Sequence, residues 1–247
     1  MQDRVKILGV KIDKIKIDRL LNKTLLYLNQ ASFHSIYFVG MNTVFLAEKE
    51  EKFIDFLENC DYVIAAETTI ETKLYGEKNG GKAEKQLQAQ RYIERLLTRL
   101  SKNKATLYLI GDDNDELETI TTYFSESYHS ISCFRSCVEE ETKEDAIDFI
   151  INDINSVAPD IMIILMDGMK TMEFIQENRS RMDVKLCLYL GDAKDEVLVE
   201  HGIEIEAPSW VRKIYAEKLY CYIVKKYNFS RTISKKRLKN KIKKEEL

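Results

Sequence analysis

Five short apolar runs constrain the fold of this 247-residue chain more than any other feature. Almost every residue in them is apolar, with no alternation of polar and apolar side chains. Such runs are typical of strands that are covered on both faces, as in a parallel sheet between two layers of helices. We therefore predict strands at Ser35–Val39, Asp61–Ala66, Ala105–Ile110, Asp160–Met166 and Lys185–Leu190.

Amphipathic segments with a helical period separate these runs. Alternation of strands and helices predicts a three-layer, Rossmann-like α/β domain with a mostly parallel sheet and right-handed crossovers. We place this domain at residues 1–205 and a helical C-terminal appendage with a basic tail at residues 206–247. The predicted helices are Asp18–Asn29, Thr43–Asn59, Glu84–Lys102, Asp113–Ser127, Glu141–Val157 and Thr171–Arg181.

The net charge of −3 hides a strong asymmetry. Residues 225–247 hold ten Lys or Arg and two Glu, so the rest of the chain carries a charge of −11. Each cation near an anionic membrane contributes about 1 kcal/mol of binding free energy. We expect this tail to bind an anionic membrane surface. The alternatives are a solvated tail or one that contacts RNA without sequence specificity.

Composition also excludes several classes of protein. The chain has no apolar stretch near the roughly 20 residues that span a bilayer, and its first residues lack a signal-peptide core. We expect a cytoplasmic protein, peripheral at the inner face of the cell membrane. Five cysteines and three histidines form no recognisable zinc pattern, so we expect reduced thiols, no metal and no cofactor. Neither a dinucleotide fingerprint nor a P-loop is present.

In parallel α/β sheets, ligands bind where the strands end at their carboxyl edge. Several of the segments that follow the five runs combine Gly with a carboxylate or Lys, which suits a phosphate-bearing ligand at helix N-termini. The same residue types also serve as turn and N-cap residues, and that alternative stays open for each of them. The candidate residues here are Asn42, Thr43, Glu67, Gly111, Asp112, Asp167, Gly168, Lys170, Gly191, Asp192 and Asp195.

A series of short motifs follows a familiar order along the chain. Val5–Asp13 is similar to an opening strand "ILGV.ID", Leu107–Gly111 to "vFLlGg" and Pro159–Ile164 to "PDlllv". Near the C-terminus, residues 206–213 are similar to "RAPrWmrr" and residues 216–220 to "LEWlyR". Over about residues 4–222 the chain resembles the WecG/TagA/CpsF family of bacterial glycosyltransferases.

The resemblance implies an activity and partners. Members of this family transfer a sugar, such as N-acetylmannosamine, from a UDP-sugar to an undecaprenyl-diphosphate-linked sugar, without a metal and with inversion. It therefore implies a UDP-sugar donor, a polyprenyl-linked acceptor and a C-terminal appendage that docks on the membrane; the chain could also pair with itself or with another glycosyltransferase. Arg212, Lys213 and Lys170 are the cations expected to balance the diphosphate of the donor.

The chain departs from the family pattern at chemical positions. Ala66 stands where the family has the aspartate proposed as catalytic base, and we take the adjacent Glu67 as the candidate base. A shift of one residue directs the side chain to the other face if the strand continues, whereas Glu67 can serve if the strand has ended. Asp167, Asp192 and Asp195 are alternative carboxylates.

Three interpretations follow from these patterns. The first is a divergent glycosyltransferase of cell-surface or exopolysaccharide synthesis. The second is a catalytically inactive paralogue that binds a nucleotide sugar or partners an active glycosyltransferase. The third is an unrelated α/β binding domain whose basic tail binds nucleic acid.

Overall fold

A computed structural model of the chain describes residues 3–76, 88–139 and 144–194. Within them a six-stranded sheet has the order β4-β3-β8-β7-β5-β6, and every neighbouring pair is parallel. All five predicted strands are confirmed, and so is the Rossmann-like α/β class. The strands are β3 (His34–Val39), β4 (Tyr62–Ala65), β5 (Thr106–Gly111), β6 (Ser132–Cys137), β7 (Ile161–Ile164) and β8 (Leu186–Tyr189).

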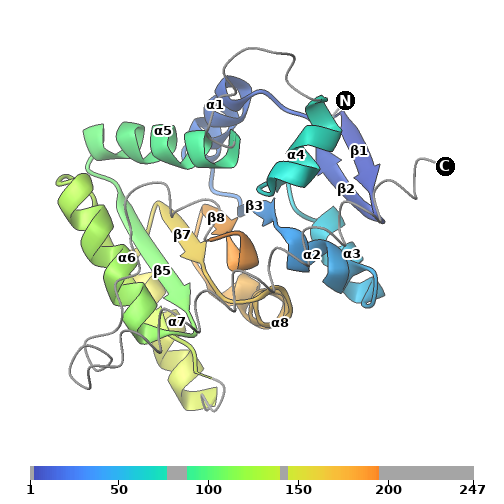
Figure 1. Ribbon diagram of the computed structural model, residues 1–247. Coiled ribbons are helices and arrows are strands. Elements are labelled where there is room, and N and C mark those ends of the chain that lie inside the picture. Colours follow the sequence, from blue (N-terminus) through green and yellow to red (C-terminus); the bar gives the residue numbers. More distant parts are fainter. Residues whose placement is uncertain (1–2, 77–87, 140–143, 195–247) are drawn as a thin grey trace, which may run out of the picture.

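Helices cover both faces of this sheet, as Figure 1 shows for α1 and α5 on one side and α8 on the other. The helices α1, α5 and α6 pack on one face, and α2, α3, α7 and α8 pack on the other. Their bounds are α1 (Ile17–Tyr27), α2 (Met41–Ala47), α3 (Glu51–Glu58), α4 (Thr68–Tyr75), α5 (Gln88–Lys102), α6 (Asn114–Ser127), α7 (Glu144–Val157) and α8 (Gly168–Asn178), with the 3-10 turns η1 (Arg179–Arg181) and η2 (Gly191–Ala193).

Alternate side chains of each central strand enter the two helical layers. In β8, for example, Cys187 and Tyr189 pack beneath α3 and α8, whereas Leu186 and Leu188 pack against the opposite layer. Because both sets must be apolar, the strand sequences show no alternation, which is the pattern from which the parallel sheet was predicted.

The structure corrects some predicted elements. The single helix expected at Thr43–Asn59 is two helices, α2 and α3, because the backbone at Glu50 is extended (φ −123°, ψ 99°). Helix α4 and strand β6 were not predicted. Strand β6 lies at the sheet edge with polar, partly exposed residues, so it lacks the continuous apolar run of a central strand.

The expected opening strand Val5–Asp13 is also wrong in form. It is an antiparallel hairpin of β1 (Arg4–Ile7) and β2 (Val10–Asp13), separate from the main sheet. Leu8 and Gly9 both have positive φ values, 47° and 88°, which matches the two-residue turns that suit the twist of antiparallel strands. Ile7, Leu8 and Val10 are all apolar, so no polar turn residue marks the boundary between the two strands in the sequence.

A buried carboxylate anchors the hairpin to β4. Asp13 is 2% exposed; its Oδ2 accepts a 2.7 Å hydrogen bond from the Val63 backbone N–H, and its Oδ1 accepts a 3.0 Å bond from Arg4 Nε. Burial raises the pKa of Asp13, while the Val63 N–H and Arg4 act in the opposite direction. The same Arg4 donates to the backbone oxygens of Cys60 and Asp61, at 3.2 and 3.4 Å.

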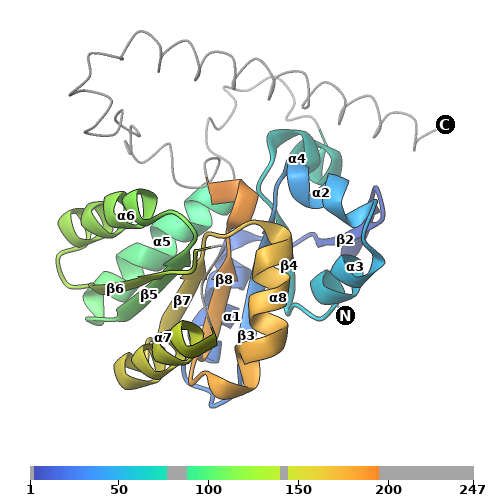
Figure 2. The ribbon, with the colours of Figure 1, turned by 90° about the horizontal axis from the view of Figure 1, so that it is seen from below.

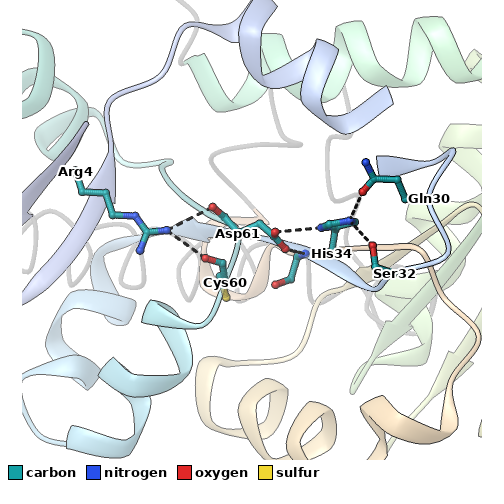
Figure 3. A network of polar contacts seen from close by, with 7 residues as sticks. Arg4, Gln30, Ser32, His34, Cys60 and Asp61 are labelled. Atoms are coloured by element: carbon teal, nitrogen blue, oxygen red, sulfur yellow. Dashed lines mark hydrogen bonds and ion pairs between the residues drawn. The ribbon is translucent and has the colours of Figure 1, made fainter. Parts of the chain in front are cut away.

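Figure 3 shows this network continuing from Asp61 to His34, Gln30 and Ser32. Asp61 contacts the His34 ring through Oδ1 at 3.1 Å and accepts from the Ser35 N–H through Oδ2 at 2.8 Å. These bonds fix the amino ends of β3 and β4 side by side. They therefore fix the register of β3 and β4, and with it the relative positions of the two strand ends at the carboxyl edge of the sheet.

We expect Asp13→Ala to lower the free energy of unfolding by about 2–4 kcal/mol, because it leaves Arg4 and the Val63 N–H without their buried acceptor. The matched control is Lys11→Ala on the same hairpin, whose ion pair with Glu58 is about half exposed. That variant should change stability by less than about 0.5 kcal/mol. Urea unfolding followed by circular dichroism measures both, and equal effects would contradict this anchoring role.

Candidate active site

The parallel topology brings the predicted site segments to one edge of the sheet. All six strands run in the same direction, so the segments after β4, β3, β8, β7 and β5 follow one another along the carboxyl edge in that spatial order. Figure 2 shows two of the helices that begin there, α2 and α4, next to each other at the same end of the molecule. The grouping expected from the sequence is therefore present in the fold.

Glu67 lies where β4 has ended and α4 begins. The Ala66 N–H still donates to the Val39 carbonyl at 2.9 Å, and Glu67 is the N-cap residue of α4 with extended backbone (φ −115°, ψ 130°). Ala66 packs with the α1–α5 face. Because side chains alternate along extended backbone, Glu67 is directed to the face that α2 and α3 cover, where its side chain is only 1% exposed.

The segment after β3 runs directly into α2. Gly40 is the N-cap residue, so Asn42 and Thr43 lie in the first turn of the helix. Thr43 is buried, whereas Asn42 is exposed. Because β3 neighbours β4, this turn lies at the same part of the edge as Glu67.

The neighbouring strands β5 and β7 are followed by helices that lie on opposite faces of the sheet. The chain continues from β5 into α6 on one face and from β7 into α8 on the other, the arrangement that opens a ligand crevice in α/β sheets. An ion pair spans this point: Lys170 Nζ lies 2.8 Å from Asp112 Oδ2. Two predicted residues from separate segments are therefore in direct contact.

Other predicted residues at this edge have structural roles. Asp167 is the N-cap of α8, and its Oδ1 accepts a 3.0 Å bond from the Lys170 N–H. A Cβ on Gly168 would lie 2.8 Å from Phe53 Cζ, so glycine permits α8 to pack against α3. A Cβ on Gly111 would lie 3.2 Å from Leu117, which similarly reflects close packing of α6.

The segment after β8 contributes a residue that was not predicted. Gly191 has φ +46°, and a Cβ there would lie 3.1 Å from the Met166 carbonyl oxygen. Asp192 follows it in η2. One residue beyond η2, Lys194 Nζ lies 2.5 Å from Glu116 Oε2 in the first turn of α6. The signal in the sequence was the position of Lys194 in a segment already expected at this edge.

A comparison with models of protein families identifies the family of this chain. The model of the glycosyl transferase WecG/TagA/CpsF family matches residues 5–235. The chain belongs to the WecG/TagA/CpsF family of glycosyltransferases. None of the curated proteins compared matches the chain.

Several predicted residues of this glycosyltransferase-family protein lie outside the described residues. They are Asp195, Arg212 and Lys213, together with the proposed domain boundary at residue 205 and the basic tail at 225–247. Within the described residues, no helix is long and apolar enough to cross a membrane. In the same residues, no group of three or more His, Cys, Asp or Glu side chains is placed to hold a metal ion.

A cavity of about 520 Å³ lies at the other, amino edge of the sheet. Its walls come from the start of β3, the C-terminal ends of α3 and α8, the 3-10 turn η1 and strand β8, and include Ser35, Cys60, Arg179 and Tyr189. Burial raises the pKa of the Cys60 thiol to about 12, so this thiol is protonated at neutral pH. No predicted site residue lines this cavity.

We expect Asp167→Ala to destabilise the protein by about 1 kcal/mol through loss of the α8 N-cap. Asp167→Asn should retain most of that stability, since an amide oxygen also accepts the Lys170 N–H. Urea unfolding of the two variants measures the difference. If the alanine variant unfolds like the wild type, Asp167 does not act as a cap.

Proposed function

We propose that the protein transfers a sugar from a UDP-sugar to a polyprenyl-diphosphate-linked acceptor, in the synthesis of a cell-surface polysaccharide or exopolysaccharide. The observation that carries this proposal is the family match over residues 5–235. The convergence of the predicted segments on the carboxyl edge supports it, because that edge is where α/β sheets bind nucleotides.

The donor fits this edge for electrostatic reasons. A departing UDP develops negative charge, which helix N-termini and cations stabilise. Helix α8 begins at this crevice; its first turn holds Lys170, and its N-cap Asp167 is the single carboxylate at that helix end, against four at the start of α6. Arg212 and Lys213 remain predicted cations of the same site.

The acceptor requires a base near its hydroxyl group. Glu67 is the candidate, since it lies at the end of β4 next to the first turn of α2. Asn42 and Thr43 would then contact the acceptor or the sugar that is transferred.

We further propose that residues 225–247 attach the protein to the inner face of the cell membrane. Their ten cations suit an anionic lipid surface, which also supplies the polyprenyl-linked acceptor. Surface attachment would restrict the search for this acceptor to two dimensions.

One observation favours a second candidate function. Ala66 stands in the place of the family's proposed catalytic aspartate, and Glu67 is 1% exposed. A base with so little exposed surface would reach an acceptor hydroxyl only if a neighbouring group moved. The alternative is a catalytically inactive paralogue that binds a nucleotide sugar or partners an active glycosyltransferase.

The two candidates differ in the effect of Glu67→Gln. For an enzyme we expect turnover to fall by roughly 10²–10⁴-fold, the usual contribution of a general base, with donor affinity unchanged. UDP release from a UDP-sugar in the presence of a polyprenyl-linked acceptor measures turnover, and calorimetry measures affinity. The matched control is Glu71→Gln, one turn further along α4 and also buried, which should retain activity if it folds.

The outcomes distinguish the two candidates. Wild-type turnover that depends on Glu67 supports the enzyme. Nucleotide-sugar binding without turnover, over a panel of donors and acceptors, supports the inactive paralogue. Absence of both binding and turnover contradicts both.

A further inference from the structure

Two lysines at adjacent strand ends pair with carboxylates of the same segment. Lys170, which follows β7, contacts Asp112 at 2.8 Å, and Lys194, which follows β8, contacts Glu116 at 2.5 Å. Both carboxylates belong to the segment in which β5 ends and α6 begins. Because β8, β7 and β5 are consecutive in the sheet, the two ion pairs lie next to each other along its carboxyl edge.

These pairs are accessible and yet partly desolvated. The side-chain exposures are 37% for Lys170 and 26% for Asp112, and 24% for Lys194 and 19% for Glu116. Ion pairs of this exposure contribute little net stability, so a stronger anion can displace the carboxylates. A lysine suits such an exchange, because its flexible stem carries an ammonium group that binds phosphate as a point charge.

The distribution of acidic residues determines where an anion would bind. The N-terminus of α6 carries Asp113, Asp115 and Glu116, and Asp112 precedes it, so this helix end repels a diphosphate. The start of α8 carries a single carboxylate, that of its N-cap Asp167, whose Oδ1 accepts the Lys170 N–H, and η2 contacts α8. The favourable position is therefore on the β7–β8 side, at the positive end of α8.

We infer that Lys194 is a further cation for the diphosphate of the nucleotide-sugar donor and forms a clamp with Lys170. Before the donor arrives, Glu116 and Asp112 hold the two ammonium groups at the crevice. On binding, the ammonium groups exchange these carboxylates for phosphate oxygens. The assignment of the ligand as a nucleotide sugar rests on the proposed function, whereas the preference for a diphosphate follows from the charges.

Lys194 lies one residue beyond η2, and its ammonium group reaches Glu116 in the first turn of α6. A cation at this position would add to the binding of the donor and has no role in proton transfer.

Calorimetry of the full chain with UDP, uridine and inorganic pyrophosphate tests the clamp. We expect Lys194→Gln to weaken UDP and pyrophosphate binding by about tenfold or more, the loss of one charge-assisted contact, and to leave uridine binding unchanged. The matched control is Lys185→Gln, an exposed lysine at the amino end of β8. It should bind all three probes like the wild type.

A second variant tests the exchange itself. Glu116→Gln removes the competing carboxylate, so UDP should bind about threefold more tightly, a change of less than one factor of ten. Weaker UDP binding by this variant would overturn the exchange. Circular dichroism of each variant verifies that it is folded.

The outcomes separate the clamp from the proposed function. Lysine-dependent pyrophosphate binding without UDP binding would support the clamp and contradict the UDP-sugar donor. UDP binding that Lys194→Gln does not weaken would overturn the clamp and leave the donor intact. Absence of binding by both UDP and pyrophosphate would overturn both.

Discussion

The parallel pairing of β8 with both β3 and β7 is the constraint on which the rest of this structure depends. Leu186 lies opposite His34 on one side and opposite Ile161 on the other, so β8 joins β4–β3 to β7–β5–β6. The candidate base lies at the end of one half, and the Lys170–Asp112 pair lies at the end of the other. Their relative position is therefore set by β8, which comes late in the chain.

At the carboxyl edge, residues that support the fold lie next to residues proposed to contact the ligand. Gly168 permits helix packing and Asp167 caps α8, and both support the turn from which Lys170 reaches Asp112. Lys170 and Lys194 differ from these residues in that their side chains pair with carboxylates of another segment. A glycine or cap residue at this edge can therefore be required by the site without touching a ligand.

Much of this fold could be predicted from sequence because its central strands are buried on both faces. Continuous apolar runs reveal such strands, and the parallel arrangement then gives the edge at which ligands bind. Edge strand β6 escaped prediction because one exposed face removes that signal, and the hairpin escaped because Leu8 is an apolar residue within a turn.

The site was predictable to a smaller extent. The segments lie at the carboxyl edge as predicted, but sequence alone does not distinguish an aspartate that caps a helix, such as Asp167, from one that contacts a lysine, such as Asp112. The Lys194–Glu116 pair joins residues 78 positions apart, and no local pattern marks such a contact.

Hydrogen–deuterium exchange with and without UDP tests the central claim most directly, since it reports on both edges of the sheet in one experiment. If the nucleotide binds as proposed, protection should increase in the turn that begins α8 and in η2, at the carboxyl edge. The amino-edge segments around Ser35, Cys60 and Arg179 should exchange as before. Protection confined to those amino-edge segments, which line the 520 Å³ cavity, would contradict the account.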